Sequence, residues 1–471
     1  MFKVTRTEVL LILAVIVAAG MRISAARGDL WFDEVWNIRI VNETVHKPID
    51  LLLRFKHESN HMLSSLATYL VGPDGGSWSY RWPAVLFGSA TVALTAWVQR
   101  RRGWATAFAA VVLCGFSYLL VNYSSEARGY AYQLFFMLLA YAALWEAEAS
   151  RHAKWEALFA ASSFLGFLAH PLFLNLYVAA QIWSWLPLPK LSRREIIFRA
   201  VCRTIVPGLF FAWLYWINLR DITVGGGMKD PLGGVIAQVL SLFVGGPHNP
   251  PWSYAAAAIT VAVSVAAFAS LAGDRRRWTL YLYLILVAPA AVMLASGRAD
   301  IYPRYFLGSV LFLCLLWSEL AGAIRDRWGD GRVWYRGLLA AFVLANGAQV
   351  VRLIAYGRCH YTEALAAMDL RTPSKRIGLL VDHPLRHRIM FDFSAPRRAN
   401  GKPLDFSLPT EETVRTADWI LSHDLDVNFA PPPAITFDTG EEFRLVEQYP
   451  YAGLSGWHLA LYRRVDPRPS D

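Results

Sequence analysis

The sequence has 471 residues, of which 55% are hydrophobic, 14% aromatic and only 17% charged, and its mean hydropathy is +0.32. Soluble domains carry about a quarter charged residues, so this composition excludes an ordinary soluble protein and indicates a polytopic membrane protein. The formal net charge of +10 does not indicate a nucleic-acid partner, because the basic residues gather in short clusters between long apolar blocks.

Eleven apolar stretches are long enough to be membrane-spanning helices, each of which needs about 20 mostly apolar residues. The first could be a cleavable signal peptide, but the many later spans favour a retained anchor. Two shorter stretches, residues 61–72 and 235–246, are predicted as partial or interfacial helices. The eleven spans are predicted near residues 7–26, 82–99, 104–121, 130–147, 156–172, 172–189, 201–219, 252–272, 279–297, 305–322 and 337–354.

Lysine and arginine residues gather in alternate loops, which predicts the orientation. With a cytoplasmic N-terminus, the cytoplasmic side receives the basic clusters, and the opposite side receives only scattered single bases. We therefore expect a multi-pass protein of the cytoplasmic (inner) membrane. Residues 1–354 form the expected transmembrane domain, and its first exterior loop spans residues 27–61. The basic clusters lie around residues 100–102, 151–154, 190–203, 275–277 and 325–336.

The composition changes after about residue 355, where charged residues and prolines become frequent and no later run is long enough to span. Residues 376–382, 417–423 and 456–464 are predicted as strands, and residues 384–394 as a helix between two of them. We expect residues 355–471 to form a small α/β domain. On the predicted topology this domain is exterior, that is, periplasmic.

Several polar residues gather at the exterior ends of the predicted spans. Ionisable groups at membrane depth are costly and usually functional, so their presence in one layer predicts a single site. The first exterior loop holds the acidic residues Asp29, Asp33 and Glu34 in "GDLWFDEVWN", in which Asp33 and Glu34 lie between two tryptophans. The other candidates are His61 in "ESNHMLSS" (residues 58–65), Glu126 and Arg128 in "NYSSEARGY" (residues 122–130), His170 at the end of the fifth span, and Arg298, Asp300, Arg304 and Tyr305 in "GRADIYPRY" (residues 297–305).

Each of these features also has a purely structural interpretation. The carboxylates could be hydrated or could cap the next helix. Trp31 and Trp36 fit an aromatic belt at the membrane interface. The remaining alternatives are a local ion pair between the two charged residues of "SSEARG", a structural histidine at the helix end, and an arginine that only anchors its helix.

The order of these motifs resembles the GT-C membrane glycosyltransferases, in particular the branch of the protein O-mannosyltransferases and lipid A aminoarabinose transferases. That branch has an Asp-Glu pair in the first outer loop, an Asn-His segment, an Arg-Leu-Pro-like helix start, a Tyr-Ser-x-Glu-Ala-Arg-x-Tyr junction and a late Arg-Tyr helix start. The resemblance covers about the first 320 residues. The matching segments are "LWFDEVWN" (30–37), "NHMLSS" (60–65), "YRWPAVLFG" (80–88), "YSSEARGY" (123–130) and "PRYFLGS" (303–309).

The resemblance implies transfer of a sugar, with inversion, from a polyprenyl-phosphate donor in the membrane to a glycan, lipid or protein acceptor. The residue chemistry agrees with this function. An acceptor hydroxyl needs one base, whereas a phosphate leaving group needs fixed positive charge rather than a second acid. We predict Asp33 as the base and Glu34 as its orienting partner. The predicted contacts to the donor phosphate or sugar are Arg128 positioned by Glu126, Arg304, Tyr305, His61 and His170.

No cofactor is expected, because the resemblance is to a branch that uses lipid monophosphates without a catalytic metal. A divalent ion held by Asp29, Asp33 and Glu34 is the alternative. The main rival function is a transporter or flippase of lipid-linked sugars, but transporters usually place charges near the bilayer midplane, and these spans are nearly free of charge. A non-catalytic membrane subunit is the other rival, and the acidic pair together with "YSSEARGY" argues against it.

The predicted topology can be tested with a reporter that is active only in the cytoplasm. Fused after residue 471, it should give no signal, because eleven spans place that end outside. Fused after residue 102, within the first basic cluster, it should give a strong signal. A strong signal from the fusion after residue 471 would contradict the exterior placement of every candidate residue.

Overall fold

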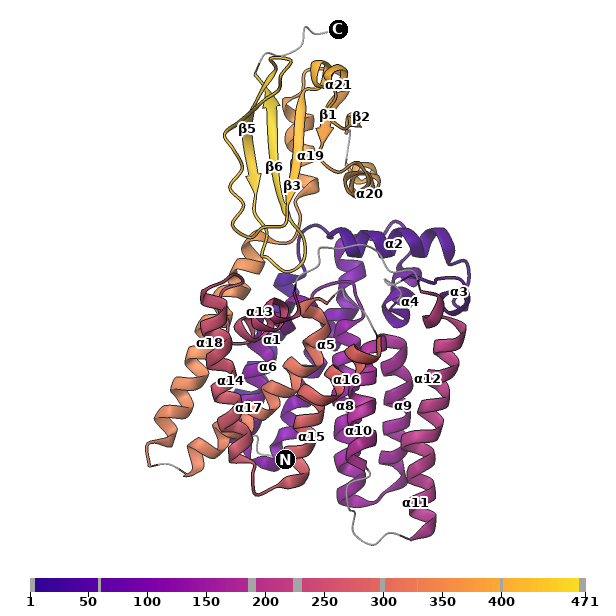
Figure 1. The fold of residues 1–471 in the computed structure, drawn as a ribbon, viewed down its shortest axis with the longest axis vertical. Helices are drawn as coiled ribbons and strands as arrows, with labels where there is room; N and C mark the ends of the chain where they lie inside the picture. The colour runs from indigo at the N-terminus through magenta and orange to yellow at the C-terminus, as the bar shows by residue number, and fades with distance from the viewer. Residues whose placement is uncertain are drawn as a thin grey trace. The chain divides into compact units, whose positions relative to one another are not determined.

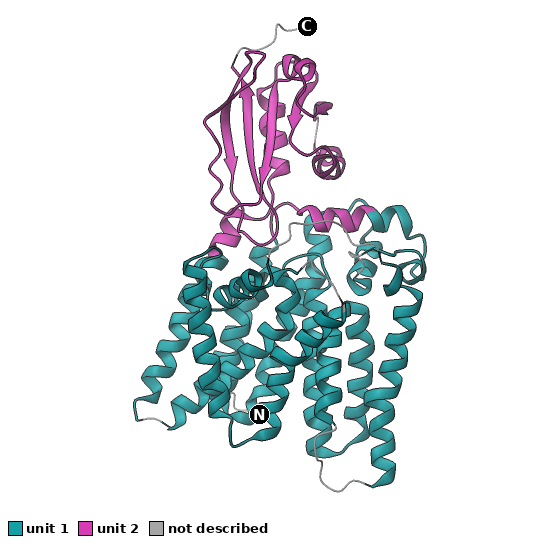
Figure 2. Ribbon diagram, in the orientation of Figure 1, with its two compact units in different colours: residues 1–26, 40–350 teal, residues 27–39, 351–471 magenta. Residues whose placement is uncertain are grey.

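The computed structural model describes residues 5–57, 61–184, 192–222, 231–296, 301–327, 329–398 and 401–465. The chain forms two compact units, shown in different colours in Figure 2. One unit comprises Met1–Ala26 and Ile40–Val350 and is helical. The other comprises Arg27–Arg39 and Val351–Asp471 and contains a β-sheet.

Helices occupy all the stretches that the sequence predicts as spans, as far as these are described (Figure 1). Within the described residues, six helical segments are long and apolar enough to cross a membrane, so the predicted polytopic helical class is confirmed. The helices at the predicted spans are α1 (Arg6–Ala25), α5 (Ser77–Gln99), α6 (Trp104–Phe116) with α7 (Tyr118–Tyr123), α8 (Tyr130–Ser150), α9 (Ala153–Ala169), α10 (Leu174–Ser184), α11 (Arg193–Ala200) with α12 (Val206–Ile217), α14 (Trp252–Ser270), α15 (Arg275–Leu282) with α16 (Ala288–Ser296), α17 (Leu307–Arg327) and α18 (Gly331–Tyr356).

The two shorter helices are also present, as α4 (Met62–Val71) and α13 (Leu232–Phe243). The expected loop over residues 27–61 instead contains two helices, α2 (Phe32–Thr44) and α3 (Asp50–Leu53). Asp33 and Glu34 lie in the first turn of α2, where carboxylates interact favourably with the helix dipole. Short 3₁₀ or π-helical turns complete the unit: η1 (Arg100–Arg102), η2 (Pro171–Phe173), η3 (Val201–Ile205), η4 (Leu219–Asp221), η5 (Tyr283–Val287) and η6 (Pro303–Phe306).

The π-helical turn η3 lies between α11 and α12, just before Pro207. Proline has no N–H, so the carbonyl of Arg203, four residues earlier, loses its helical partner. The Gln181 side chain of α10 donates from Nε2 to this carbonyl at 2.9 Å. The Tyr177 hydroxyl donates to the next carbonyl, that of Thr204, at 2.8 Å. The Gln181 side chain therefore replaces the hydrogen bond that the proline removes, and Tyr177 adds a second link from α10.

The same arrangement recurs at η5, between α15 and α16, where Pro289 follows the π-helical turn. Pro289 leaves the carbonyl of Ile285 without its helical donor. The Ser309 hydroxyl at the start of α17 donates to that carbonyl at 3.1 Å. These two spans are thus tied to a neighbouring helix at the point where a proline interrupts their own hydrogen bonds.

Arg22 provides a third link of this kind, between α1 and the end of α6. Its guanidinium is buried, with 1% of its surface exposed. It donates to the carbonyls of Cys114 at 3.1 Å and Gly115 at 3.0 Å, in the last turn of α6. Those carbonyls have no partner within their own helix, so the Arg22 guanidinium supplies the hydrogen bonds that they lack.

The second unit contains a six-stranded sheet of order β2-β1-β3-β6-β5-β4. β1 is parallel to β2 and β3, and the remaining pairs are antiparallel. The predicted α/β class is confirmed. Strands β1, β3 and β6 and helix α20 lie where they were predicted, whereas the other strands and helices were not predicted. The bounds are α19 (Tyr361–Arg371), β1 (Ile377–Val381), α20 (Pro384–Ser394), η7 (Ala395–Arg397), β2 (Leu404–Ser407), α21 (Glu411–Thr416), β3 (Trp419–Asp424), β4 (Ala434–Thr436), β5 (Glu442–Tyr449) and β6 (His458–Arg464).

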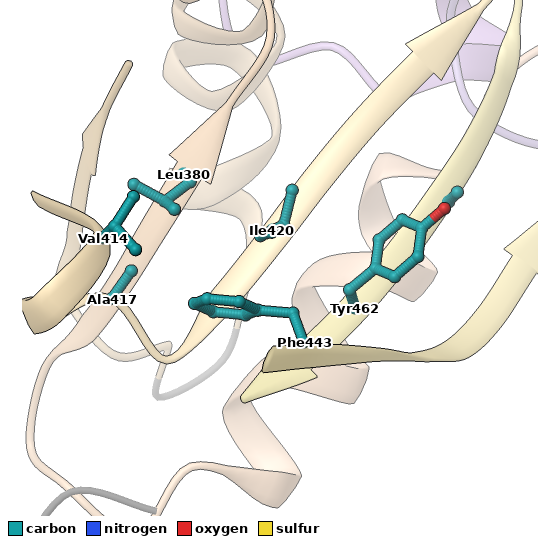
Figure 3. Close-up of a cluster of buried hydrophobic side chains, with 7 residues drawn as sticks. Leu380, Val414, Ala417, Ile420, Phe443 and Tyr462 are labelled. Carbon is teal, nitrogen blue, oxygen red and sulfur yellow. The ribbon is translucent and has the colours of Figure 1, made fainter. Parts of the chain in front are cut away.

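One face of this sheet carries a continuous apolar core (Figure 3). Leu380 of β1 pairs with Ile420 of β3, which pairs with Tyr462 of β6. Residues paired in register point to the same face, so these side chains form one stripe across three strands. Val414 of α21 and Phe443 of β5 pack against the stripe. The core therefore holds β1, β3 and β6 side by side.

Candidate functional site

A cavity of about 530 Å³ in the helical unit is lined by five of the residues that the sequence singles out. They come from four separate segments of the chain, so the fold brings them together. Asn60, Arg298 and Asp300, which neighbour these segments in sequence, lie outside the described residues. The five lining residues are His61 at the start of α4, Arg128 just before α8, His170 between α9 and η2, and Arg304 and Tyr305 in η6.

His61 is held by the turn that precedes α8. Its Nδ1 accepts the backbone N–H of Gly129 at 3.1 Å, so the imidazole carries its proton on Nε2. Burial, together with the nearby His170, Arg128 and Arg304, holds the pKa of His61 well below its usual value. At neutral pH this histidine is therefore an uncharged hydrogen-bond donor.

His170 is held in the same way at the break between α9 and η2. Its Nδ1 accepts the backbone N–H of Leu172 at 3.0 Å. The His61 and His170 rings lie 4.5 Å apart, centre to centre, and the Tyr130 ring lies 5.3 and 5.0 Å from them. Backbone N–H groups thus bind the Nδ1 atom of two adjacent imidazoles, which leaves Nε2 as the donor atom of each.

Two guanidinium groups add positive charge to this end of the cavity. The Arg128 Cζ lies 5.5 Å from the ring centre of Tyr130, and the Arg304 Cζ lies 4.5 Å from that of Tyr302. Such cation–π contacts help to orient a guanidinium. None of the described residues lining the cavity is a carboxylate. The polar end of the cavity is therefore suited to an anion.

Glu126 is fully buried but does not appear among the described lining residues. Its Oε1 accepts from Asn122 Nδ2 at 3.0 Å, and its backbone carbonyl accepts the N–H of Arg128 at 2.8 Å. Both bonds belong to the tight turn between α7 and α8. Glu126 thus stabilises the segment that carries Arg128, and its predicted role in positioning that arginine stays a prediction.

The other end of the cavity is apolar and comes mainly from η2, α10, α12, η4 with the residue after it, and α16. Tyr215, Ala291 and Ala295 are exposed on the surface of the spanning helices, so this end reaches the surface that faces lipid. The apolar lining residues are Leu172, Leu174, Val178, Phe211, Leu219, Ile222, Pro289, Val292, Met293 and Ile301. The cavity as a whole is suited to an amphipathic ligand with an anionic head.

Asn175 of α10 also lines the cavity, although no sequence motif marks it as a site residue. Its side chain is buried, and its Oδ1 has no hydrogen-bond partner within the described part of the chain. A buried acceptor without a partner is costly, so this oxygen is a natural contact for a ligand hydroxyl or amine. The available signal was a lone amide in the apolar stretch "PLFLNLYVA" (residues 171–179).

The acidic residues Asp29, Asp33 and Glu34 belong to the other unit. Glu34 is fully buried, and its Oε2 accepts the backbone N–H of Trp31 at 3.0 Å. Asp33 is partly exposed beside it in the first turn of α2. Asp29 accepts from the backbone N–H and the hydroxyl of Thr362, each at 2.7 Å. Glu34 therefore stabilises the start of α2, which carries Asp33.

No protein-family model matches the chain, and no curated protein sequence matches it. Several solved structures are similar to it. The oligosaccharyltransferase of Archaeoglobus fulgidus, in a complex with Zn and sulfate, is 10% identical, with a TM-score of 0.53 over 88% of this chain and 68% of that one. The same organism's oligosaccharyltransferase AglB, in complex with an inhibitory peptide and a dolichol-phosphate, is 11% identical, with a TM-score of 0.51 over 88% and 69%.

ArnT from Cupriavidus metallidurans in the apo state is 12% identical, with a TM-score of 0.49 over 96% of this chain and 97% of that one. The likeness to the two archaeal structures shows that this chain has the fold of the GT-C glycosyltransferases. The fold predicted from the motifs is therefore confirmed.

Gly129 gives a direct test of how the histidine pair is held. A Cβ at this position would overlap the carbonyl oxygen of Ala169 and the Cβ of His61. We expect Gly129→Ala to destabilise the protein by about 1–3 kcal/mol, as overpacking does. The readout is the apparent midpoint of thermal unfolding of the purified protein in detergent.

The matched control is Gly347→Ala in α18, where a Cβ would meet nothing within 4 Å. Its midpoint should stay the same or rise slightly, because alanine has the higher helix propensity. Equal midpoints for the two variants would contradict the close packing described here.

Proposed function

We propose that this chain transfers a sugar from a polyprenyl-phosphate donor to an acceptor hydroxyl at the outer face of the cytoplasmic membrane, with inversion. The observation that carries this proposal is the cavity, which combines two arginines and two imidazoles with an apolar wall that reaches the lipid-facing surface. A sugar phosphate on an isoprenoid chain has the matching amphipathic chemistry. The AglB complex with a dolichol-phosphate supports this class of ligand for the fold.

In the proposed reaction the acceptor oxygen attacks the anomeric carbon as the bond from that carbon to the phosphate oxygen breaks. The bonding electron pair leaves with the polyprenyl phosphate, and the acceptor proton goes to a base. Arg128 and Arg304 stabilise the charge that develops on the departing phosphate, because a guanidinium binds two phosphate oxygens at once. His61, His170 and Tyr305 contribute hydrogen bonds to the phosphate or the sugar.

Asp33 is the proposed base, and Glu34 is the proposed positioning residue. One carboxylate is enough for this chemistry, since a phosphate ester leaves without protonation. A glycosidase, by contrast, needs two opposed carboxyl groups. Because Glu34 is buried and accepts the N–H of Trp31, it holds the first turn of α2, on which Asp33 lies.

The second candidate function is a transporter or flippase of lipid-linked sugars, which would use the same amphipathic cavity. The two functions differ in what happens to the donor. A transporter leaves the bond between sugar and phosphate intact and needs two compartments, whereas a transferase consumes the donor in detergent solution. Consumption of a polyprenyl-phosphate sugar by the purified protein with an acceptor present, and without any gradient, would decide for the transferase.

The arginines give the first prediction from this mechanism. Arg128→Lys and Arg304→Lys keep the charge but lose the planar pair of donors, so single-turnover rates should fall about tenfold or more. Arg194→Lys, at an exposed position on α11, is the matched control and should keep full activity. Full activity in both cavity variants would place the donor phosphate elsewhere.

The acidic pair gives the second prediction. Asp33→Asn keeps the shape of the side chain but accepts no proton at neutral pH, so the single-turnover rate should fall about 10²–10⁴-fold. Donor binding should largely survive, because the phosphate contacts remain. Glu34→Gln should cost less, since the amide oxygen still accepts the N–H of Trp31.

Donor affinity and single-turnover rate are measured on the same purified variants. Full turnover in Asp33→Asn would exclude this residue as the base. Equal loss of rate from both substitutions, together with loss of donor binding, would instead favour a metal site at the acidic cluster or a disrupted α2.

A further inference from the structure

The carboxyl ends of β1 and β3 carry a cluster of ionisable side chains that the proposed reaction does not use. The chain leaves β1 through α20 to form β2 on one side, and then crosses to form β3 on the other side of β1. Ligands of open α/β sheets bind at this kind of reversal, beyond the carboxyl ends of the parallel strands. Asp382 directly follows β1, His387 lies in α20, and His423 lies near the end of β3.

Three possible metal-ligand atoms converge at this edge. The Asp382 Oδ1 lies 2.8 Å from the His387 Nε2 and 2.8 Å from the His423 Nδ1. Each of the three residues offers one ligand atom, and these atoms all lie within 4.8 Å of one another. A tetrahedral ion with bonds of about 2.0–2.1 Å needs its ligand atoms to lie about 3.3 Å from one another. Small shifts of the three side chains are enough to reach this spacing.

Two of the three ligands are already oriented by a further partner. The Tyr361 hydroxyl lies 3.0 Å from the His387 Nδ1, and both side chains are fully buried. The backbone N–H of His423 donates to the Asp382 Oδ2 at 2.6 Å, which turns Oδ1 toward the two imidazoles. Partners of this kind are typical of metal sites, where they fix the tautomer and the direction of the ligand. Asp382 is partly exposed, so the cluster is open on one side.

The third ligand has a partner that competes with a cation. The Arg386 Nη1 lies 2.8 Å from the His423 Nε2, and a guanidinium only donates, so His423 carries its proton on Nδ1, facing Asp382. A metal at Nδ1 would move that proton to Nε2 and displace Arg386. The Arg386 Cζ already lies 5.8 Å from the ring centre of Trp457, which offers the displaced arginine a cation–π contact.

We propose that Asp382, His387 and His423 form a binding site for a divalent transition-metal ion, with zinc the best fit. One carboxylate oxygen and two imidazole nitrogens are a zinc donor set, and the open side of the cluster leaves the fourth position to water or another ligand. The bound ion joins the ends of β1, α20 and β3. Arg386 supplies positive charge at the same place and lowers the affinity for the metal. This site is independent of sugar transfer.

The test uses zinc alone with the full-length protein, purified in detergent with a tag free of histidine. After treatment with EDTA and dialysis, the wild type should take up one zinc ion per chain, measured by metal analysis and by competition with a chromophoric chelator. Asp382→Asn, His387→Gln and His423→Gln should each weaken zinc binding at least tenfold. Zinc should raise the midpoint of thermal unfolding of the wild type and leave that of the three variants unchanged.

The matched control is His383→Asn, one residue from Asp382. His383 caps α20 by accepting the N–H of Arg386 at 3.4 Å, and asparagine also serves at that position. This variant should bind zinc like the wild type. Arg386→Met removes the competing cation and should raise the affinity for zinc, a gain that misfolding cannot produce. Uptake in the wild type no tighter than in His387→Gln, or no gain in Arg386→Met, would overturn the proposal.

Discussion

The structure of the helical unit depends on one constraint, that backbone N–H and C=O groups inside a membrane have no water to bind and must be paired within the protein. At two breaks in the spanning helices, a side chain replaces the lost bond. Gln181 binds the carbonyl that Pro207 leaves unpaired, and Ser309 binds the carbonyl that Pro289 leaves unpaired. Arg22 pairs the carbonyls at the end of α6. Its two hydrogen bonds to these carbonyls offset the cost of burying its charge.

The same constraint sets the chemistry of the candidate site. The cavity lies where α4, α8 and η2 begin, and helix starts expose backbone N–H groups. His61 and His170 each accept one of these groups at Nδ1, which leaves Nε2 as the donor atom. A histidine that stabilises a helix start is thereby also prepared to bind a ligand oxygen. For His170, the structural interpretation that the sequence offers is therefore compatible with the proposed binding role, because the hydrogen bond uses only Nδ1.

Features of the fold that depend on neighbouring residues can be predicted from the sequence, whereas features that depend on contacts between distant residues cannot. Spans, and strands such as β1 and β6, follow from local hydrophobicity, and the sequence predicts both. The short edge strands β2 and β4 do not, because neither has a buried apolar run. The residues of "YSSEARGY" were identified through their motif, whereas Asn175 has no motif around it. Asp382 and His423 are 41 positions apart, and only the parallel pairing of β1 with β3 brings them together.

The donor and acceptor groups in the cavity also restrict which ligand can satisfy it. The guanidinium groups of Arg128 and Arg304 and the imidazoles all offer donors, and a phosphate consists of acceptors that match them. Asn175 is different, because its buried Oδ1 is an acceptor without a partner in the described part of the chain. A deprotonated phosphate has no hydrogen to give it, and neither does an isoprenoid chain. A hydroxyl or amino group on a sugar does. A sugar phosphate therefore satisfies both the donors and the acceptor of this cavity, whereas a bare lipid phosphate satisfies only the donors.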